Sequence, residues 1–312
     1  MTASQHGAPL TIGDLRGSAA RRRRELIIRS LFFVAAATAV IVSLLIVLTL
    51  VGEAVAFIGA VDLASLLSGS WQPRAGNYDM PSIIAGTFVV ATIAMVVATP
   101  LGLGAAIFLA EYASPRVRRT IKPVLEILAA IPSVVLGFFA LTVLSPTVVD
   151  VICPGPTPLF NMAAAGVAVG MLITPLVASI SEDAMYAVPG SLREASYGLG
   201  ARKRVTSLRI VFPAAVSGIV AALIVGFSRA IGETMVVAMV AGGVGGAVFN
   251  LNPCLPGQTM TAAMTALAVG SDQAGGGVAY ASLFFVGLLL FVGTLTLNVL
   301  SERFVRRIRS AY

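Results

Sequence analysis

Long segments without a charged residue recur along this chain of 312 residues. Residues 30–52 and 81–110 contain no Asp, Glu, Lys or Arg at all. A helix that crosses a bilayer needs about 20 apolar residues, because the hydrocarbon layer is about 30 Å thick. With 57% hydrophobic and 11% charged residues, the chain is too apolar for an ordinary soluble domain. We therefore expect an all-α membrane protein in contact with the lipid bilayer.

Six segments are long and apolar enough to be transmembrane helices. They cover residues 26–51, 81–110, 127–144, 162–180, 210–240 and 280–300. The chain then divides into five parts. These are a tail (1–25), a first transmembrane helix (26–53), an extracytoplasmic loop (54–80), a core with five transmembrane helices (81–305) and a second tail (306–312).

Basic residues gather on one side of these segments. They precede the first helix, follow the second, separate the fourth from the fifth, and close the chain, whereas the three alternate loops contain only Arg74. Short cytoplasmic loops retain Lys and Arg. We therefore expect a multi-pass protein of the bacterial plasma membrane, the cell inner membrane, with both termini in the cytoplasm. This topology also explains the net charge of +7 without a nucleic-acid partner.

A short polar helix is expected between the fourth and fifth predicted transmembrane helices. Ser191 is a suitable helix N-cap, and Glu194 three residues later completes a capping box. Gly198 and Gly200 supply a turn or a C-cap. The predicted topology puts this helix at the cytoplasmic surface, where we expect it to touch another protein.

The same segment resembles the cytoplasmic signature of ABC importer permeases. That signature reads Glu-Ala-Ala, three residues, Gly, nine residues and Ile-x-Leu-Pro, and the chain keeps every spacing, with Ser in place of the second Ala and Phe in place of Leu. The resemblance implies a type I ABC importer permease fold, in which this segment is the coupling helix seated in a groove of an ATPase subunit. The residues that it assigns to coupling are Glu194, Ala195, Ser196, Gly200, Ile210 and Pro213.

Two opposite charges interrupt the fifth predicted helix. Arg229 and Glu233 are four residues apart, so a continuous helix would place them on one face. Charges inside a transmembrane segment are costly unless they pair or face a polar cavity. One interpretation is a structural ion pair, to each other or to a partner helix. The other is a substrate site, because the Arg229 guanidinium can bind two oxygens of a passing oxyanion.

The segment Arg-Ala-Ile-Gly-Glu-Thr that contains both charges resembles the phosphate importer permeases of the PstC type. The resemblance implies a subunit that forms half of a phosphate translocation pathway, with Arg229, Glu233 and Thr234 in that pathway. It also implies the partners, which are a homologous PstA-type permease, two ATPase subunits that hold ATP and Mg, and an extracytoplasmic phosphate-binding protein.

An enzyme of its own is not expected in this chain. It contains no Gly-Lys dipeptide, so a P-loop cannot form, and ATP hydrolysis belongs to a partner. Its only histidine is His6, which leaves neither a Ser-His-Asp triad nor a histidine-rich metal site. We expect no catalytic residue, no bound metal and no cofactor.

Three other functions remain open at this stage. One is a permease for another oxyanion, such as sulfate or molybdate. A second is a secondary transporter or channel that needs no ATPase, although this leaves the helix near Ser191 unexplained. A third is a membrane protein that reports phosphate status without transporting it.

The two cysteines, Cys153 and Cys254, both fall in loops predicted on the outer, oxidising side. They can form a disulfide if their Cα atoms lie within about 7 Å. The alternative is two free thiols in loops that never meet. The sequence leaves both possibilities open.

Overall fold

The structure is a computed structural model that describes residues 19–242, 247–269 and 277–309. It separates into two compact units, Met1–Gly52 and Glu53–Tyr312. Most of the predicted tail 1–25 and the last three residues of the predicted tail 306–312 lie outside the described residues.

The first unit contains most of helix α2 (Ala19–Ala60). From residue 23 to residue 52 no side chain of this helix is buried. A helix that is apolar all round is suited to a bilayer. The predicted boundaries 26 and 53 were too narrow, because nothing in residues 53–60 stops a helix. Its last turns lie in the second unit, where the Phe57 ring packs on Tyr78 at 5.0 Å and on Phe285 at 5.3 Å.

The predicted loop 54–80 is ordered. It folds into η1 (Leu63–Leu67), β1 (Ser70–Gln72), η2 (Pro73–Ala75) and β2 (Asn77–Tyr78). The chain turns at Gly76, whose φ of 82° suits glycine. A distant strand, β3 (Ala247–Val248), completes a three-stranded antiparallel sheet of order β2-β1-β3. Trp71 in the central strand is only 2% exposed, so this sheet closes one end of the core.

The centre of the second unit is the pair of helices α3 (Met80–Ile107) and α7 (Met162–Tyr186). They meet through small residues, as helices in lipid do when their backbones approach closely. A Cβ on Gly166 would lie 2.6 Å from Ile93, and one on Gly170 would lie 2.8 Å from the carbonyl oxygen of Ala94. Helix α11 (Val216–Ile231) packs on both helices of this pair, and α14 (Val278–Arg309) packs on α11. Helix α3 continues as the π-helical turn η3 (Phe108–Tyr112).

The third transmembrane helix differs from the predicted range 127–144. Helix α4 (Pro115–Leu128) ends before a break, and α5 (Ser133–Phe139), η4 (Ala140–Val149) and α6 (Asp150–Ile152) follow it. The apolar span is therefore Ser133–Ile152. The cause is Pro132, because the residue before a proline is disfavoured in a helix.

The fifth predicted helix, 210–240, is broken twice. Before it come α8 (Gly190–Gly198), α9 (Lys203–Thr206) and η5 (Ser207–Val211). Then α10 (Phe212–Ala214) meets α11 at a bend of 70°, and α11 ends before α12 (Met235–Val240). Helix α13 (Met260–Val269) is too short to span a bilayer. Within the described residues, five helices are long and apolar enough to cross a membrane, or six if the bent pair counts as one span.

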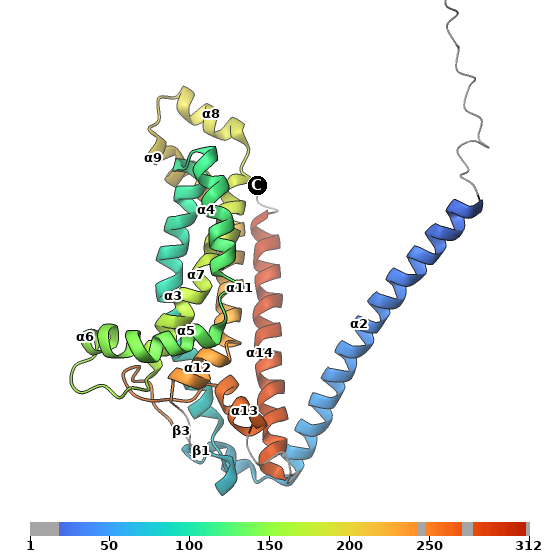
Figure 1. The fold of residues 1–312 in the computed structure, drawn as a ribbon, viewed down its shortest axis with the longest axis vertical. Helices are drawn as coiled ribbons and strands as arrows, with labels where there is room; N and C mark the ends of the chain where they lie inside the picture. The colour runs from blue at the N-terminus through green and yellow to red at the C-terminus, as the bar shows by residue number, and fades with distance from the viewer. Residues whose placement is uncertain (1–18, 243–246, 270–276, 310–312) are drawn as a thin grey trace, which may run out of the picture. The chain divides into compact units, whose positions relative to one another are not determined.

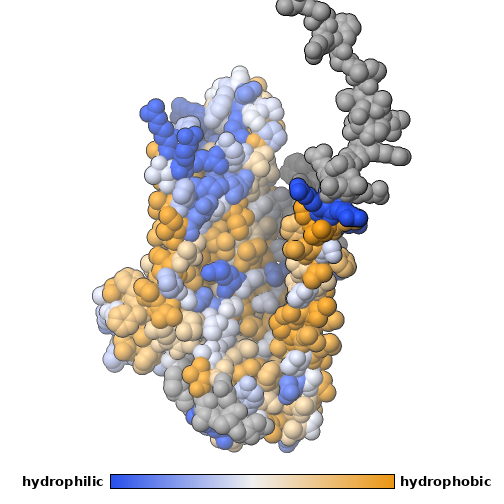
Figure 2. Space-filling view, turned by 45° about the vertical axis from the view of Figure 1, so that its right-hand side comes forward, coloured by the Kyte–Doolittle hydropathy of each residue, from blue (hydrophilic) through white to orange (hydrophobic). Residues whose placement is uncertain are grey.

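The second unit has two distinct ends. Helices α8 and α9 lie at one end, and strands β1 and β3 lie at the other (Figure 1). Hydrophilic residues gather at the α8 end, while the sides between the two ends are mostly hydrophobic (Figure 2). Within the second unit, the basic segment that follows the second predicted helix and the one between the fourth and fifth are therefore at the same end, as the prediction from the basic residues requires.

Candidate functional site

Helix α8 starts two residues earlier than the predicted N-cap at Ser191 implies. Its N-cap is Pro189, which makes no side-chain capping hydrogen bond, so the capping box predicted at Ser191 is wrong. Helix α8 ends at Gly198. The predicted turn is present at Gly200, whose φ is 78°. A Cβ on Gly200 would meet no other atom within 4 Å.

The residues predicted for coupling divide into an exposed set and an anchoring set. Glu194 and Ala195 are exposed on α8. Ser196 is 8% exposed, and its hydroxyl lies 2.9 Å from that of Thr206 on α9. Ile210 is half-buried in η5, and Pro213 is exposed in α10 at a position where a missing N–H costs little.

Large apolar side chains are exposed on α8 and directly after it. Leu192 and Tyr197 are each 43% exposed, and Leu199 is 90% exposed. Among the described residues none of them is covered, so the outer surface of α8 combines a carboxylate with apolar area. Such a surface is suited to a protein partner.

A buried carboxylate lies beneath α8. The side chain of Glu111, at the end of η3, is 3% exposed, and its Oε1 accepts hydrogen bonds from Nε and Nη2 of Arg193 at 3.0 and 2.9 Å. Its Oε2 accepts a hydrogen bond from Ser207 Oγ at 3.4 Å. We call Glu111, Arg193 and Ser207 the Glu111 network.

A second buried carboxylate lies at the end of α7. The Glu182 side chain is fully buried, and it pairs with Arg118 at 2.5 Å and with Lys122 at 2.9 Å. Lys122 also pairs with the exposed Asp183. Partial burial by itself lowers the pKa of Lys122, but the hydrogen bonds and charges of Asp183 and Glu182 outweigh it, so the pKa lies above the usual lysine value. These pairs tie α4 to α7.

The charges predicted to share a helix face do not share one. Helix α11 ends at Ile231, and Gly232, Glu233 and Thr234 form a non-helical break before α12. Arg229 is exposed on the last turn of α11, while Glu233 is half-buried in the break. In the described part of the chain neither side chain forms an ion pair, so the intrachain pair between them is absent.

The break is held in place by main-chain and hydroxyl groups. Thr261 Oγ1 on α13 donates to the carbonyl oxygen of Glu233 at 2.7 Å, and Thr234 Oγ1 donates to that of Gly232 at 3.2 Å. The N–H of Met260 donates to Thr87 Oγ1 on α3 at 2.9 Å. Helix α13 therefore fixes the break against α3. This leaves the Arg229 guanidinium able to bind an anion without giving up a partner.

The two cysteines are joined. Cys153 at the end of α6 and Cys254 form a disulfide with a Cα–Cα distance of 5.8 Å. It closes a loop of 101 residues and links the segment before α7 to the segment before α13.

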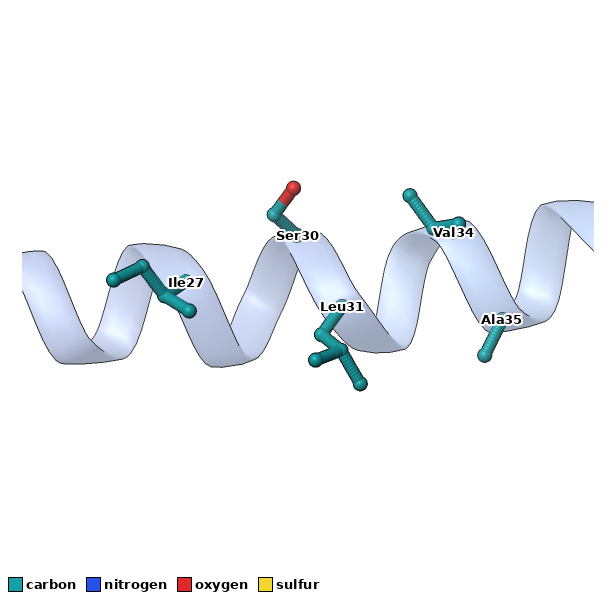
Figure 3. A pocket seen from close by; sticks show the side chains of 5 residues that line it. All are labelled: Ile27, Ser30, Leu31, Val34 and Ala35. Atoms are coloured by element: carbon teal, nitrogen blue, oxygen red, sulfur yellow. The ribbon is translucent and has the colours of Figure 1, made fainter.

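One surface depression lies on the first unit. Ile27, Ser30, Leu31, Val34 and Ala35 of α2 line it (Figure 3). Ser30 is its only polar residue, so it offers no charge to an anion. None of the predicted site residues lines it, and the described residues contain no group of three His, Cys, Asp or Glu that could hold a metal ion.

Sequence reasoning missed Glu111 and Glu182 as members of the site. Each is the first acidic residue after a charge-free apolar segment, 81–110 and 162–180 respectively. That position marks where a transmembrane helix reaches polar surroundings. This position could have indicated both carboxylates from the sequence. It does not identify their partners, which are 60 residues from Glu182 and 82 residues from Glu111.

Comparison with known proteins gives a consistent result. Residues 98–310 match the family described as "Binding-protein-dependent transport system inner membrane component". The chain is 33% identical to the phosphate transport system permease protein PstC of Xylella fastidiosa, over 77% of this chain and 78% of that protein. It is 35% identical to the probable ABC transporter permease protein YqgH of Bacillus subtilis, over 75% of this chain and 74% of that protein.

A solved structure has the same fold. A chain of the crystal structure of a bacterial alginate ABC transporter, in complex with an alginate-bound periplasmic protein, superimposes with a TM-score of 0.62 and 14% identity. The alignment covers 91% of this chain and 97% of that chain. The type I importer permease fold predicted from the sequence is confirmed.

Proposed function

This chain belongs to the family of binding-protein-dependent transport inner membrane components, and from that membership we propose that it is the permease subunit of an ATP-driven phosphate importer. Its relatives are transporter subunits rather than enzymes. In this proposal the chain forms half of the translocation pathway, a PstA-type permease forms the other half, and ATP and Mg are held by two ATPase subunits.

The observation that carries the choice of substrate is the exposed, unpaired Arg229 at the end of α11. It lies within a segment that resembles phosphate permeases, beside the break at Gly232. A guanidinium presents its donors in a planar fork that matches two oxygens of a phosphate. Near a transmembrane region such an unpaired charge is costly, so a passing anion is a reasonable partner for it.

The coupling role rests on the outer surface of α8. Glu194 and the exposed apolar side chains of this segment are the groups that we propose to enter a groove of the ATPase. In this arrangement the α8 end and both termini face the cytoplasm, and the sheet end faces an extracytoplasmic phosphate-binding protein. Movement of the ATPases then shifts α8 and rocks the transmembrane helices between two openings.

Reconstituted transport tests the proposal. Proteoliposomes with this chain and all its partners should take up labelled phosphate only when both ATP and the binding protein are present. Uptake should resist competition by sulfate or molybdate. Preferential uptake of either competitor would assign a different oxyanion, and transport by this chain alone, without ATP, would indicate a secondary transporter instead.

A further inference from the structure

The Glu111 network joins parts of the chain that the proposed coupling step must move together. Glu111 ends the α3 span, Arg193 lies on α8 and Ser207 lies in η5. A carboxylate that is removed from water is costly unless it is paired and hydrogen-bonded. The network satisfies that condition, because both oxygens of Glu111 have partners.

Arg193 extends the connection to α7. Its Nη2 also donates to the carbonyl oxygen of Met185 at 2.8 Å, and its Nη1 donates to that of Val188 at 2.6 Å. The rigid guanidinium thus fixes the end of α7, the start of α8 and the end of the α3 span in one geometry. Lysine cannot reproduce this arrangement, because its ammonium is a compact point charge without the planar fork of donors.

Helix α8 has few other attachments to the core. Ser196 is the only buried residue of α8, and its hydrogen bond reaches Thr206 on the neighbouring short helix α9. Apolar packing is therefore not what connects α8 to the spans. A displacement of α8 reaches α3 through the charged hydrogen bonds between Arg193 and Glu111.

We propose that Glu111 is the positioning residue that transmits movement of α8 to the α3 span during transport. The inference rests on the proposed function, since it presumes that α8 is the element moved by an ATPase. Glu111 touches neither phosphate nor ATP in this account. It acts through Arg193, and its charge is the property that matters.

The test measures phosphate transported per ATP hydrolysed in proteoliposomes that contain the complete complex. Glu111→Gln keeps the size of the side chain and removes its charge, and Glu111→Asp keeps the charge on a shorter side chain. Glu126→Gln makes the same chemical change at an exposed position of α4. We expect the ratio to fall about fivefold or more in Glu111→Gln, to fall less in Glu111→Asp, and to stay unchanged in Glu126→Gln.

A purely structural role predicts a different result. It would lower the yield of assembled complex in Glu111→Gln and leave the transport ratio of the remaining complexes normal, and that outcome would overturn the inference. An unchanged ratio with normal yield would overturn it as well.

A second measurement separates this inference from the proposed substrate. Hydrogen exchange of the α8 amides in the complete complex should be faster in Glu111→Gln, while the middle of α7 stays protected. If the wild-type complex transports another oxyanion, the proposal that phosphate is the substrate is wrong. The number of anions transported per ATP hydrolysed is then measured with that oxyanion. Unaltered exchange in α8 would contradict the role of Glu111 whichever anion is transported.

Discussion

Lys122 on α4 donates a 2.9 Å hydrogen bond to Oε2 of the fully buried Glu182 on α7. Folding raises the pKa of Lys122, so the folded state holds this proton more tightly than the unfolded state does. The resulting stabilisation is fully present below the ordinary lysine pKa of about 10.4. It is lost as the pH rises through the raised pKa of the folded protein.

The pH dependence of unfolding checks this relationship. We expect the apparent melting temperature of the detergent-solubilised chain to fall above about pH 10.4. The part of that fall due to Lys122 should be missing in Lys122→Met, which should also be less stable at pH 8. Identical pH profiles of the two proteins would show that the pair does not stabilise the fold.

A glycine on α3 lies where no side chain fits. A Cβ on Gly86 would lie 2.3 Å from the carbonyl oxygen of Gln258, which directly precedes the segment that docks α13. We expect Gly86→Ala to lower the free energy of unfolding by about 1–3 kcal/mol. Gly104→Ala is the matched control on the same helix, because a Cβ there meets nothing within 4 Å. Equal melting temperatures for the two variants would contradict the close approach.

The transmembrane segments could be predicted because apolar length is a local property. Residues 81–110 carry that signal without any knowledge of neighbours, and the Glu194 to Gly200 spacing is equally local. The breaks before Ser133 and at Gly232 were missed for a physical reason. Proline and glycine are common within transmembrane helices. A single residue such as Pro132 or Gly232 therefore does not by itself predict that the helix is broken.

The contacts of the site could not be predicted in the same way. Glu111 and Arg193 are 82 residues apart, and they meet only because α3 and α7 pack side by side. For Arg229 and Glu233 the sequence predicted a shared helix face that the structure does not have. Their spacing of four suggested one helix face, but helix α11 ends between them, at Ile231, and Thr261 holds the carbonyl of the break that follows.

Arg229→Ala should stop phosphate uptake without weakening the fold. Arg229 is exposed and forms no ion pair among the described residues, so its loss should change stability by no more than about 0.5 kcal/mol. Charge-assisted hydrogen bonds to an anion are each worth about 1.5–3 kcal/mol. Uptake by Arg229→Ala should therefore fall at least about tenfold. Uptake by Arg229→Lys should lie between that of Arg229→Ala and that of the wild type. Loss of assembly in Arg229→Ala would instead favour a structural pair with a partner helix.

The disulfide between Cys153 and Cys254 should stabilise the chain. It closes a loop of 101 residues, and a disulfide that constrains the unfolded state typically contributes about 2–4 kcal/mol. We expect the double replacement Cys153→Ser and Cys254→Ser to lower the melting temperature. A reducing agent should lower it in the wild-type chain and have no effect on the double variant. Mass spectrometry without reduction checks the bond directly, and two free thiols in membranes from growing cells would refute it.

Glu194→Ala should separate ATP hydrolysis from transport. Glu194 is exposed on α8 and has no ion pair in the described part of the chain, so the fold does not depend on it. At an interface, a central charged residue that pairs with its partner often dominates the binding energy. We expect stimulation of the ATPase by the loaded binding protein to fall about tenfold or more. Docking of the binding protein should be unchanged, because we propose that it occurs at the sheet end of the core. Ser191→Ala, which alters another exposed residue of the same helix, is the control. Equal loss of stimulation in both variants would mean that α8 as a whole, rather than its carboxylate, makes the contact.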